Sequence, residues 1–266
     1  MAKGKAKVNY LGRAGLVAAK DAPDWSFLYD VSSTRDSKWN IGDRVVLPDG
    51  REFRYAKSVG ACHAGHGCEF TYTGYTSYTA FAVAAAVGDK EVTVPAATHA
   101  ALTTDELRGG YIIIFDGSDD SNTTVRGIIG NASAAADAAF KVYLDAKLTN
   151  AIVAGTEACE VYRNPYAALQ DGSVNTYPKA GIPAAYVSAS GKYFWVQTNG
   201  ITWMSPQSGV GGSQGQHGAF WRHDGSIDKA DTALATTVPA GSSSQYAGYC
   251  VAGNQAGNGP LFNLKG

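Results

Sequence analysis

Gly42–Tyr55 reads Gly-Asp-Arg-Val-Val-Leu-Pro-Asp-Gly-Arg-Glu-Phe-Arg-Tyr and predicts a β-hairpin near the start of the folded chain. Val45–Leu47 is a short apolar run, and the Pro-Asp-Gly that follows it is typical of a tight turn. Beyond the turn, Phe53 and Tyr55 alternate with charged residues, which is the pattern of a strand with one buried face. The stretch therefore predicts two short strands joined by a turn.

Short runs with strand character continue along the chain. Tyr111–Phe115 is a continuous apolar run, the polar loop Asp116–Asn122 follows it, and Thr123–Ile129 returns as its partner, so we expect a second hairpin. The other runs are Glu91–Val94, Phe140–Leu144, Glu160–Arg163 and Tyr193–Thr198. Many short strands separated by turns predict a mainly β fold with a β-sandwich or β-barrel-like core.

The composition agrees with this fold class and also bears on the surface. The chain has 266 residues, enough to bury a sizeable core, and it contains 32 glycines and 15 tyrosines. Charged residues make up 17% of the chain, against roughly a quarter in a typical soluble domain. A low charge content suits a protein whose surface is largely covered by partners.

Composition divides the chain into three parts. Residues 1–41 have little strand periodicity and predict an extended N-terminal arm. Residues 42–207 hold the strand runs and form the predicted β-rich core domain. Residues 208–266 are rich in glycine and serine and predict a loop-rich C-terminal extension, in which Ala233–Pro239 and Ala247–Val251 are candidate short strands.

The arm is basic and aromatic, and each feature has two interpretations. Five of its cations precede the first acid, Asp21, and these either form a solvated terminus or dock on an acidic partner. Its aromatic side chains either fill pockets on a neighbouring subunit or pack on the protein's own body. With residues of the hairpin they make up the candidate partner contacts, which are Lys3, Lys5, Lys7, Arg13, Trp25, Phe27, Tyr29, Trp39, Arg51, Phe53, Arg54 and Tyr55.

Charge and hydropathy argue against several classes of function. The formal net charge is −1, whereas a protein dominated by phosphate contacts is basic, so we expect no direct binding to nucleic acid. No apolar run is long enough for a membrane helix, so we expect no membrane partner. Leu16–Ala19 is too short for the apolar region of a signal peptide, which predicts synthesis in the cytoplasm.

Cys62–Cys68 gathers two cysteines and two histidines in one short run. Three alternatives stay open for it: free thiols, a disulfide between the two cysteines, or a zinc site built on Cys62, His63, His66 and Cys68. Common structural zinc sites place a longer loop between pairs of ligands, so four ligands here would be crowded. Free thiols are therefore the preferred interpretation, and we expect no metal and no cofactor.

The short motifs that mark common catalytic sites give no convincing candidate. His-Glu-x-x-His and a phosphate-binding Gly-Lys-Ser/Thr are missing. The glycine-rich run Gly209–Gly215 contains a Gly-x-Ser-x-Gly match, but it lacks the preceding strand and following helix that a catalytic or nucleotide-binding loop needs, and it predicts a flexible loop. The acidic loop Asp116–Asn122 lacks the ligand spacing of an EF-hand and predicts a solvated hairpin tip. We therefore expect a protein that is not an enzyme.

The order of five motifs resembles the capsid decoration proteins of tailed bacteriophages, also called cement or head-stabilising proteins. Members of that family often begin with a strand pair around Leu-Pro-Asp-Gly-Arg-x-Phe-Arg-Tyr, and this chain has that pattern from Leu47 to Tyr55. The resemblance covers about residues 42–200 and excludes residues 1–41 and the part after Trp203. Its motifs are Leu47–Lys57, Gly110–Gly117, Arg163–Tyr166, Gly181–Pro183 and Tyr193–Gly200.

The resemblance implies a β-rich structural virion protein, often a homotrimer, that binds the exterior of the capsid and clamps neighbouring copies of the major capsid protein. The alternative is another virion component, such as a head fibre, a tail part or a glycan- or receptor-binding module. We also expect that deleting residues 1–41 weakens capsid binding and leaves the body folded.

Overall fold

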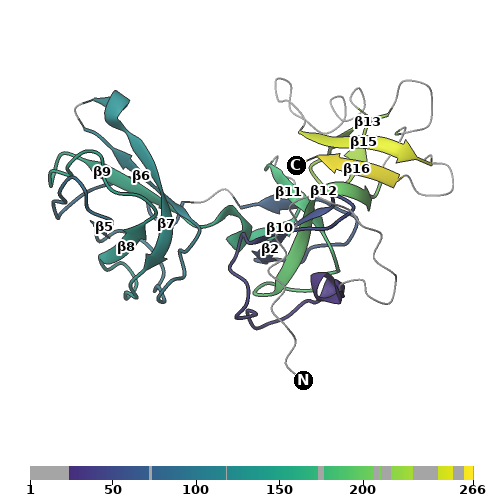
Figure 1. Cartoon of the computed structure of the whole chain (residues 1–266), viewed down its shortest axis with the longest axis horizontal. Helices are drawn as coiled ribbons and strands as arrows, with labels where there is room; N and C mark the ends of the chain where they lie inside the picture. The colour runs from purple at the N-terminus through teal and green to yellow at the C-terminus, as the bar shows by residue number, and fades with distance from the viewer. Residues whose placement is uncertain are drawn as a thin grey trace.

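The computed structural model describes residues 24–71, 74–117, 119–172, 177–206, 210, 217–229, 245–253 and 261–265, and the statements below concern these residues. The fold is mainly β, as predicted, with two curled antiparallel sheets that each form a half-barrel (Figure 1). Three short 3-10 turns accompany them, η2 (Ser26–Tyr29), η3 (Asp120–Asn122) and η4 (Pro165–Ala167).

The larger sheet has ten strands and the smaller sheet has six. The larger sheet consists of β1 (Arg44–Val46), β2 (Glu52–Lys57), β3 (Cys68–Phe70), β10 (Leu169–Asp171), β11 (Lys179–Pro183), β12 (Tyr193–Trp203), β13 (Gly218–Trp221), β14 (Ile227–Asp228), β15 (Tyr246–Ala252) and β16 (Leu261–Lys265). The smaller sheet runs in the order β4 (Thr79–Ala80), β9 (Ala158–Tyr162), β6 (Tyr111–Phe115), β7 (Thr124–Asn131), β8 (Phe140–Leu144) and β5 (Glu91–Val94).

The smaller sheet is an insertion into the larger one. Strands β3 and β10 are antiparallel neighbours, with Phe70 opposite Leu169, and the chain between them forms the whole of the smaller sheet. We call residues 74–163 the insertion lobe and the rest of the described chain the body; the two lie side by side along the long axis (Figure 1). The sheets thus divide the chain differently from the expected boundaries at residues 41 and 207, because one strand pair of the body closes around the lobe.

Both predicted hairpins are present. In the first, Val45 of β1 lies opposite Phe53 of β2, and Gly50 in the turn has a φ of 85°, a conformation that glycine adopts without strain. The Gly50 amide donates to the Leu47 carbonyl at 2.9 Å, which closes the turn. In the second, β6 and β7 pair with Ile113 opposite Val125.

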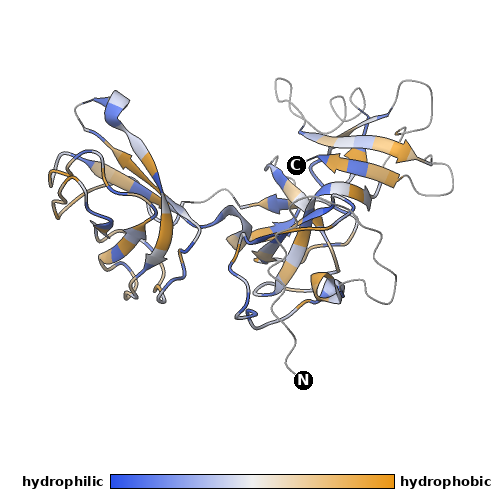
Figure 2. Ribbon diagram, in the orientation of Figure 1, coloured by the Kyte–Doolittle hydropathy of each residue, from blue (hydrophilic) through white to orange (hydrophobic). Residues whose placement is uncertain are grey.

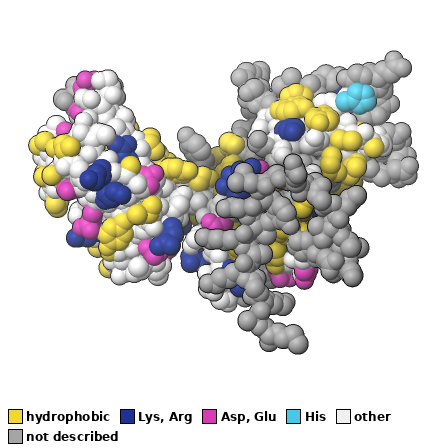
Figure 3. Space-filling model, viewed as in Figure 1, with side chains coloured by type: hydrophobic (Ala, Val, Ile, Leu, Met, Phe, Trp, Pro, Cys, Tyr) yellow, Lys and Arg dark blue, Asp and Glu magenta, His cyan; other side chains and the backbone are white. Residues whose placement is uncertain are grey.

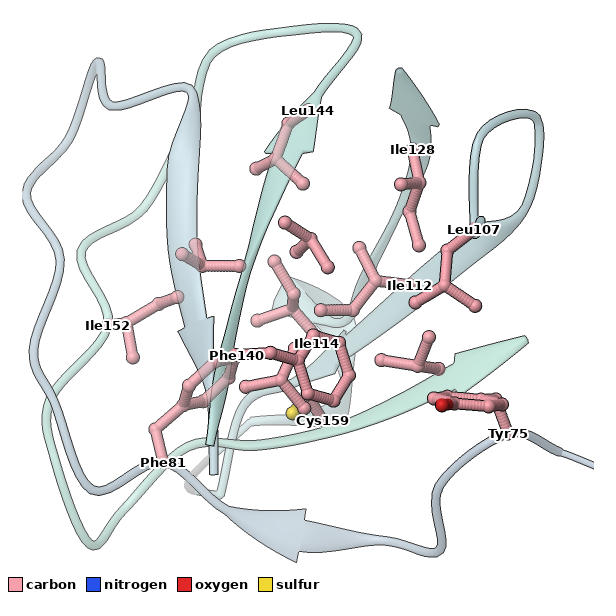
Figure 4. Close-up of a cluster of buried hydrophobic side chains, with 14 of the residues drawn as sticks. Tyr75, Phe81, Leu107, Ile112, Ile114, Ile128, Phe140, Leu144, Ile152 and Cys159 are labelled. Atoms are coloured by element: carbon pink, nitrogen blue, oxygen red, sulfur yellow. The ribbon is translucent and has the colours of Figure 1, made fainter. Parts of the chain in front are cut away.

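Each lobe has its own hydrophobic core, and apolar and polar residues alternate along several strands (Figure 2). In the insertion lobe, inward-pointing side chains from the strands and loops meet in one cluster (Figure 4). Its most deeply buried members include Leu107, Ile112, Val142, Leu144 and Val161. Two separate cores indicate two units of packing within one chain.

The C-terminal residues complete the body instead of forming a separate unit. Strand β16 pairs with β12, and β15 and β13 extend the same sheet. The expected short strand at 247–251 is part of β15, whereas 233–239 lies outside the described residues. The predicted loop-rich extension therefore contributes strands to the large sheet.

A buried ion pair ties this C-terminal part to the centre of the body. Lys179 Nζ lies 2.8 Å from Glu69 Oε2, and both side chains are almost fully buried. Lys179 Nζ also donates to the His223 carbonyl at 2.9 Å, and Gln170 Nε2 donates to Glu69 Oε1 at 3.1 Å. The Lys179 backbone exchanges two hydrogen bonds with the Gln245 side chain, so strands β3, β10 and β11 and the chain beyond β13 share one polar network.

Candidate functional site

Two of the motifs that carry the resemblance are hydrogen-bonded neighbours. Strand β2, from the first motif, pairs with β12, from the last motif, with Tyr55 opposite Trp195 and Phe53 opposite Gln197. The two are separated by most of the chain, so this pairing was not visible in the sequence. The predicted hairpin is thereby part of the central sheet of the body.

A third motif, Arg163–Tyr166, lies at the junction between the two lobes. Asn164 Nδ2 donates to the Ile41 carbonyl at 3.0 Å and to the Gly109 carbonyl at 3.1 Å, while its Oδ1 accepts from the Tyr166 amide. Ile41 belongs to the body and Gly109 to the insertion lobe. Sequence reasoning did not assign a role to Asn164, although an Asn-Pro step is a signal for a turn.

The aromatic side chains of the predicted arm pack on the protein's own body. The Phe27 and Trp39 rings stack at 5.6 Å, and each contacts Trp195 of β12 edge-on, at 5.7 Å and 4.9 Å. Trp25 packs beside Phe27, and Leu28 is fully buried in the same cluster. Trp25, Phe27 and Trp39 are half-buried against the body core, so within one chain the aromatic side chains pack on the protein's own body. Their contact with a neighbouring subunit stays a prediction.

The hairpin residues expected to contact a partner are also engaged within the chain. Phe53 and Tyr55 are buried, and burial raises the pKa of Tyr55, whose hydroxyl accepts from the Asp36 amide at 3.1 Å. Arg51 Nε pairs with Asp49 at 2.7 Å, and Arg54 Nη1 donates to the Gly42 carbonyl at 3.0 Å. These contacts explain why arginines follow the turn without invoking a partner.

The remaining predicted contacts divide into two groups. Tyr29 is 52% exposed, and its hydroxyl accepts a 3.4 Å hydrogen bond from Arg51 Nη1, so it is the one aromatic of that set with a largely open side chain among the described residues. Lys3, Lys5, Lys7 and Arg13 lie outside the described residues.

The histidine and cysteine side chains of the short run do not converge. Cys62 and Cys68 are buried free thiols, and burial, followed by the neighbouring Cys62, raises the pKa of Cys68 well above its usual range. His63 is exposed and its Nδ1 pairs with the Asp171 carboxylate on β10. Among the described residues no three histidine, cysteine or carboxylate side chains are arranged around a common metal position.

This run instead supports packing. Gly65 has a φ of 80°, and a Cβ there would lie 2.2 Å from the Trp203 ring. A Cβ on Gly67 would lie 2.6 Å from the Trp221 ring. The glycines therefore let the loop lie directly against two tryptophans of the body sheet.

Two sheet faces expose apolar side chains, and hydrophobic patches are visible on both lobes (Figure 3). On the insertion lobe, the side of β9, β6 and β7 that points away from the core carries Tyr111, Ile113, Phe115, Val125 and Ile129; we call this the outer sheet face. On the body, the exposed side of β12, β16 and β15 carries Ile201, Trp203, Leu261, Tyr249 and Val251; we call this the C-terminal sheet face.

The insertion lobe contains a small cavity. A cavity of about 20 Å³ lies between Ile114, Leu148 and Glu157, which is room for roughly one water molecule. The exposed sheet faces are therefore stronger candidates for a functional site than this cavity is.

Comparison with known proteins gives no relative: no family model, curated protein or solved structure matches the chain. Within the described residues, no helix has the length and apolar character needed to span a membrane.

Proposed function

We propose that this protein is a structural component of a tailed-phage virion that binds the outer surface of the capsid and stabilises the lattice of the major capsid protein. The observation that supports it best is the assembly of the resembling motifs. The first and last motifs pair as β2 and β12, and the third lies at the junction of the lobes. Residues that resemble one family in sequence order thus also form one connected framework.

The surface suits such a role. The insertion lobe and the body each expose an apolar sheet face, and monomeric proteins rarely leave large apolar patches uncovered. A protein repeated over a symmetric lattice multiplies one modest contact many times. A protein that binds only the expanded form of the capsid lattice stabilises the expanded form by mass action.

Capsid contact is assigned here to the C-terminal sheet face and not to the aromatic residues of the predicted arm. Trp25, Phe27 and Trp39 are half-buried against the body core, and Arg51 and Arg54 bind groups within the chain. A binding experiment should therefore place its substitution on the C-terminal sheet face at Val251, where a change leaves the core intact.

The test is co-sedimentation of the purified protein with expanded capsid shells that lack it and with unexpanded shells. We expect saturable binding to expanded shells, a higher temperature for shell disruption, and weaker binding to the unexpanded form. Binding to neither form, or binding with no gain in shell stability, would count against the proposal.

A second candidate function has one observation in its favour. The C-terminal sheet face exposes Trp203 by 49% and Tyr249 by 40%, and Asn263 Nδ2 donates to the Tyr249 hydroxyl at 2.7 Å. Exposed aromatic rings beside polar groups are typical of recognition surfaces, so a glycan- or receptor-binding virion component is the alternative. Binding to host-surface glycans that Trp203→Ala abolishes, together with labelling at the tail, would favour it.

A further inference from the structure

The outer sheet face of the insertion lobe is apolar on the side where antiparallel sheets are usually polar. The strands β6 and β7 bury Ile112, Ile114 and Ile128 in the lobe core. On the opposite side, Tyr111 is 46% exposed, Val125 56% and Ile129 52%. Tyr78 lies at the same side, because its ring is 5.1 Å from that of Phe115. One side of this sheet therefore packs on the lobe core, and the other side exposes an apolar surface.

Several acidic groups lie on or beside the outer sheet face, while Arg126 of β7 donates to the Val125 carbonyl and Arg108 is paired with Asp105. Glu160 lies opposite Ile113 on β9, within the face. A Cβ on Gly127 would lie 2.6 Å from Asp145 Oδ2, so that carboxylate lies beside the middle of β7, between Val125 and Ile129. Asp116 and Asp119 follow β6 at the hairpin tip. The outward positions of the described parts of β9, β6 and β7 carry no lysine or arginine.

The first 23 residues of the chain have the complementary character. Lys3, Lys5, Lys7, Arg13 and Lys20 all precede the first acid, Asp21. Apolar side chains stand among these cations, at Val8, Tyr10, Leu11, Leu16 and Val17. An apolar, basic segment matches a face that is apolar in the middle and acidic at its margins.

The length of this segment allows it to reach another molecule. The described chain begins on the body, where Trp25 packs beside Phe27, whereas the outer sheet face belongs to the other lobe. At about 3.3 Å for each extended residue, the 23 residues before Asp24 span roughly 75 Å. That distance exceeds the size of a single small domain.

We propose that residues 1–23 of one copy of the chain bind the outer sheet face of a second copy, and that this exchange holds the homo-oligomer together. Burial of Val125 and Ile129 supplies the apolar part of the contact, and the lysines pair with Glu160 and the aspartates. The arm of each copy contacts the next copy. In a closed ring, the outer sheet face of every copy is therefore occupied by one arm. This inference concerns the isolated protein and does not rest on the virion function.

The experiment is a measurement of molar mass in solution by light scattering on four proteins. The full chain is expected to exceed the 27.8 kDa of one copy and to dissociate toward monomer as salt rises, because exposed ion pairs are screened. Deleting residues 1–23 and substituting Val125→Lys, which repels the basic arm, are each expected to give monomers. Val87→Lys is the matched control, since Val87 is 63% exposed on the same lobe but precedes β5, away from the face.

Circular dichroism must show that the variants stay folded; a lysine at the exposed Val125 position is not expected to disturb the core. A monomeric full chain would overturn the proposal. So would a truncated protein that keeps its oligomer, or a Val125→Lys variant that behaves like Val87→Lys. None of these results depends on whether capsids bind the protein, and failure to bind capsids leaves this contact intact.

Discussion

Lys179 and Glu69 show how single residues hold the body together. The pair joins β11 to β3 in the interior and also holds the His223 carbonyl. Removing one charge leaves the other buried without its partner, which typically costs about 3–5 kcal/mol. We expect Lys179→Met to lower the free energy of unfolding by that amount in urea denaturation.

The control for this substitution is Lys141→Met, which breaks the exposed pair with Glu91. Exposed pairs contribute little to stability, so this variant should unfold close to the parent midpoint. The double variant Lys179→Met with Glu69→Leu should recover much of the lost stability, because no charge remains buried. Equal effects of Lys179→Met and Lys141→Met would contradict the role assigned to the buried pair.

Cys159 gives a second prediction at the residue scale. Burial raises the pKa of its thiol from about 9 to about 12. The thiolate is the reactive form, so Cys159 should resist a thiol reagent at pH 8 in the native protein and react on unfolding. Because the unfolded thiol ionises at the lower pH, its contribution to stability is present below about pH 9 and is lost as pH rises toward 12. Rapid native-state labelling of Cys159, located by peptide mass mapping, would contradict this.

The limits of sequence reasoning are visible in the same residues. Buried cysteines, zinc ligands and disulfide partners share one residue type, so Cys62 and Cys68 left three alternatives open. Their separation from His63 depends on Asp171, a residue far along the chain that holds the histidine. The aromatic residues of the arm were ambiguous for a similar reason, because the same side chains serve cores and interfaces.

At the scale of elements, alternation and turn residues were sufficient to predict local structure. The hairpins at β1–β2 and β6–β7 follow from a turn of suitable residues between apolar runs. Pairing between distant strands was not predictable, because the partners of β12 come from both ends of the chain. Strands β13 and β14 are short and have glycines beside them. Their alternation of apolar and polar residues was too short to predict a strand.

The N-terminal elements support a truncation prediction. Removing residues 1–23 should leave the thermal midpoint of the body nearly unchanged, whereas removing residues 1–41 deletes Leu28 and the rings of Phe27 and Trp39 from the body core. Loss of one large core side chain typically costs about 3–5 kcal/mol. The longer truncation should therefore unfold at a clearly lower temperature, in contrast to the initial expectation of an intact body. Equal midpoints for both truncations would show that residues 24–41 do not belong to the body.

At the scale of the whole molecule, the insertion lobe is separable from the body. It has its own core, and the body strands that flank it, β3 and β10, are hydrogen-bonded to each other. Replacing residues 74–163 by a short Gly-Ser linker should leave a body that unfolds cooperatively and keeps the near-ultraviolet dichroism of its packed tryptophans. A body without a cooperative transition would show that the lobe is required for its folding.

The two-lobed arrangement also suits a lattice protein, since one unit can contact the shell while the other contacts a neighbouring copy. Symmetry then requires that every copy occupies an equivalent position. The proposed function therefore predicts the number of copies on a virion and their symmetric positions, as well as binding to the capsid.

The most direct measurement is an image reconstruction of the source phage's virion, with the copies of this protein counted by quantitative mass spectrometry. The account predicts density of this β-rich shape on the capsid exterior, at symmetric lattice positions, in a number set by those positions. Absence from the virion, or a few copies confined to the tail, would contradict it.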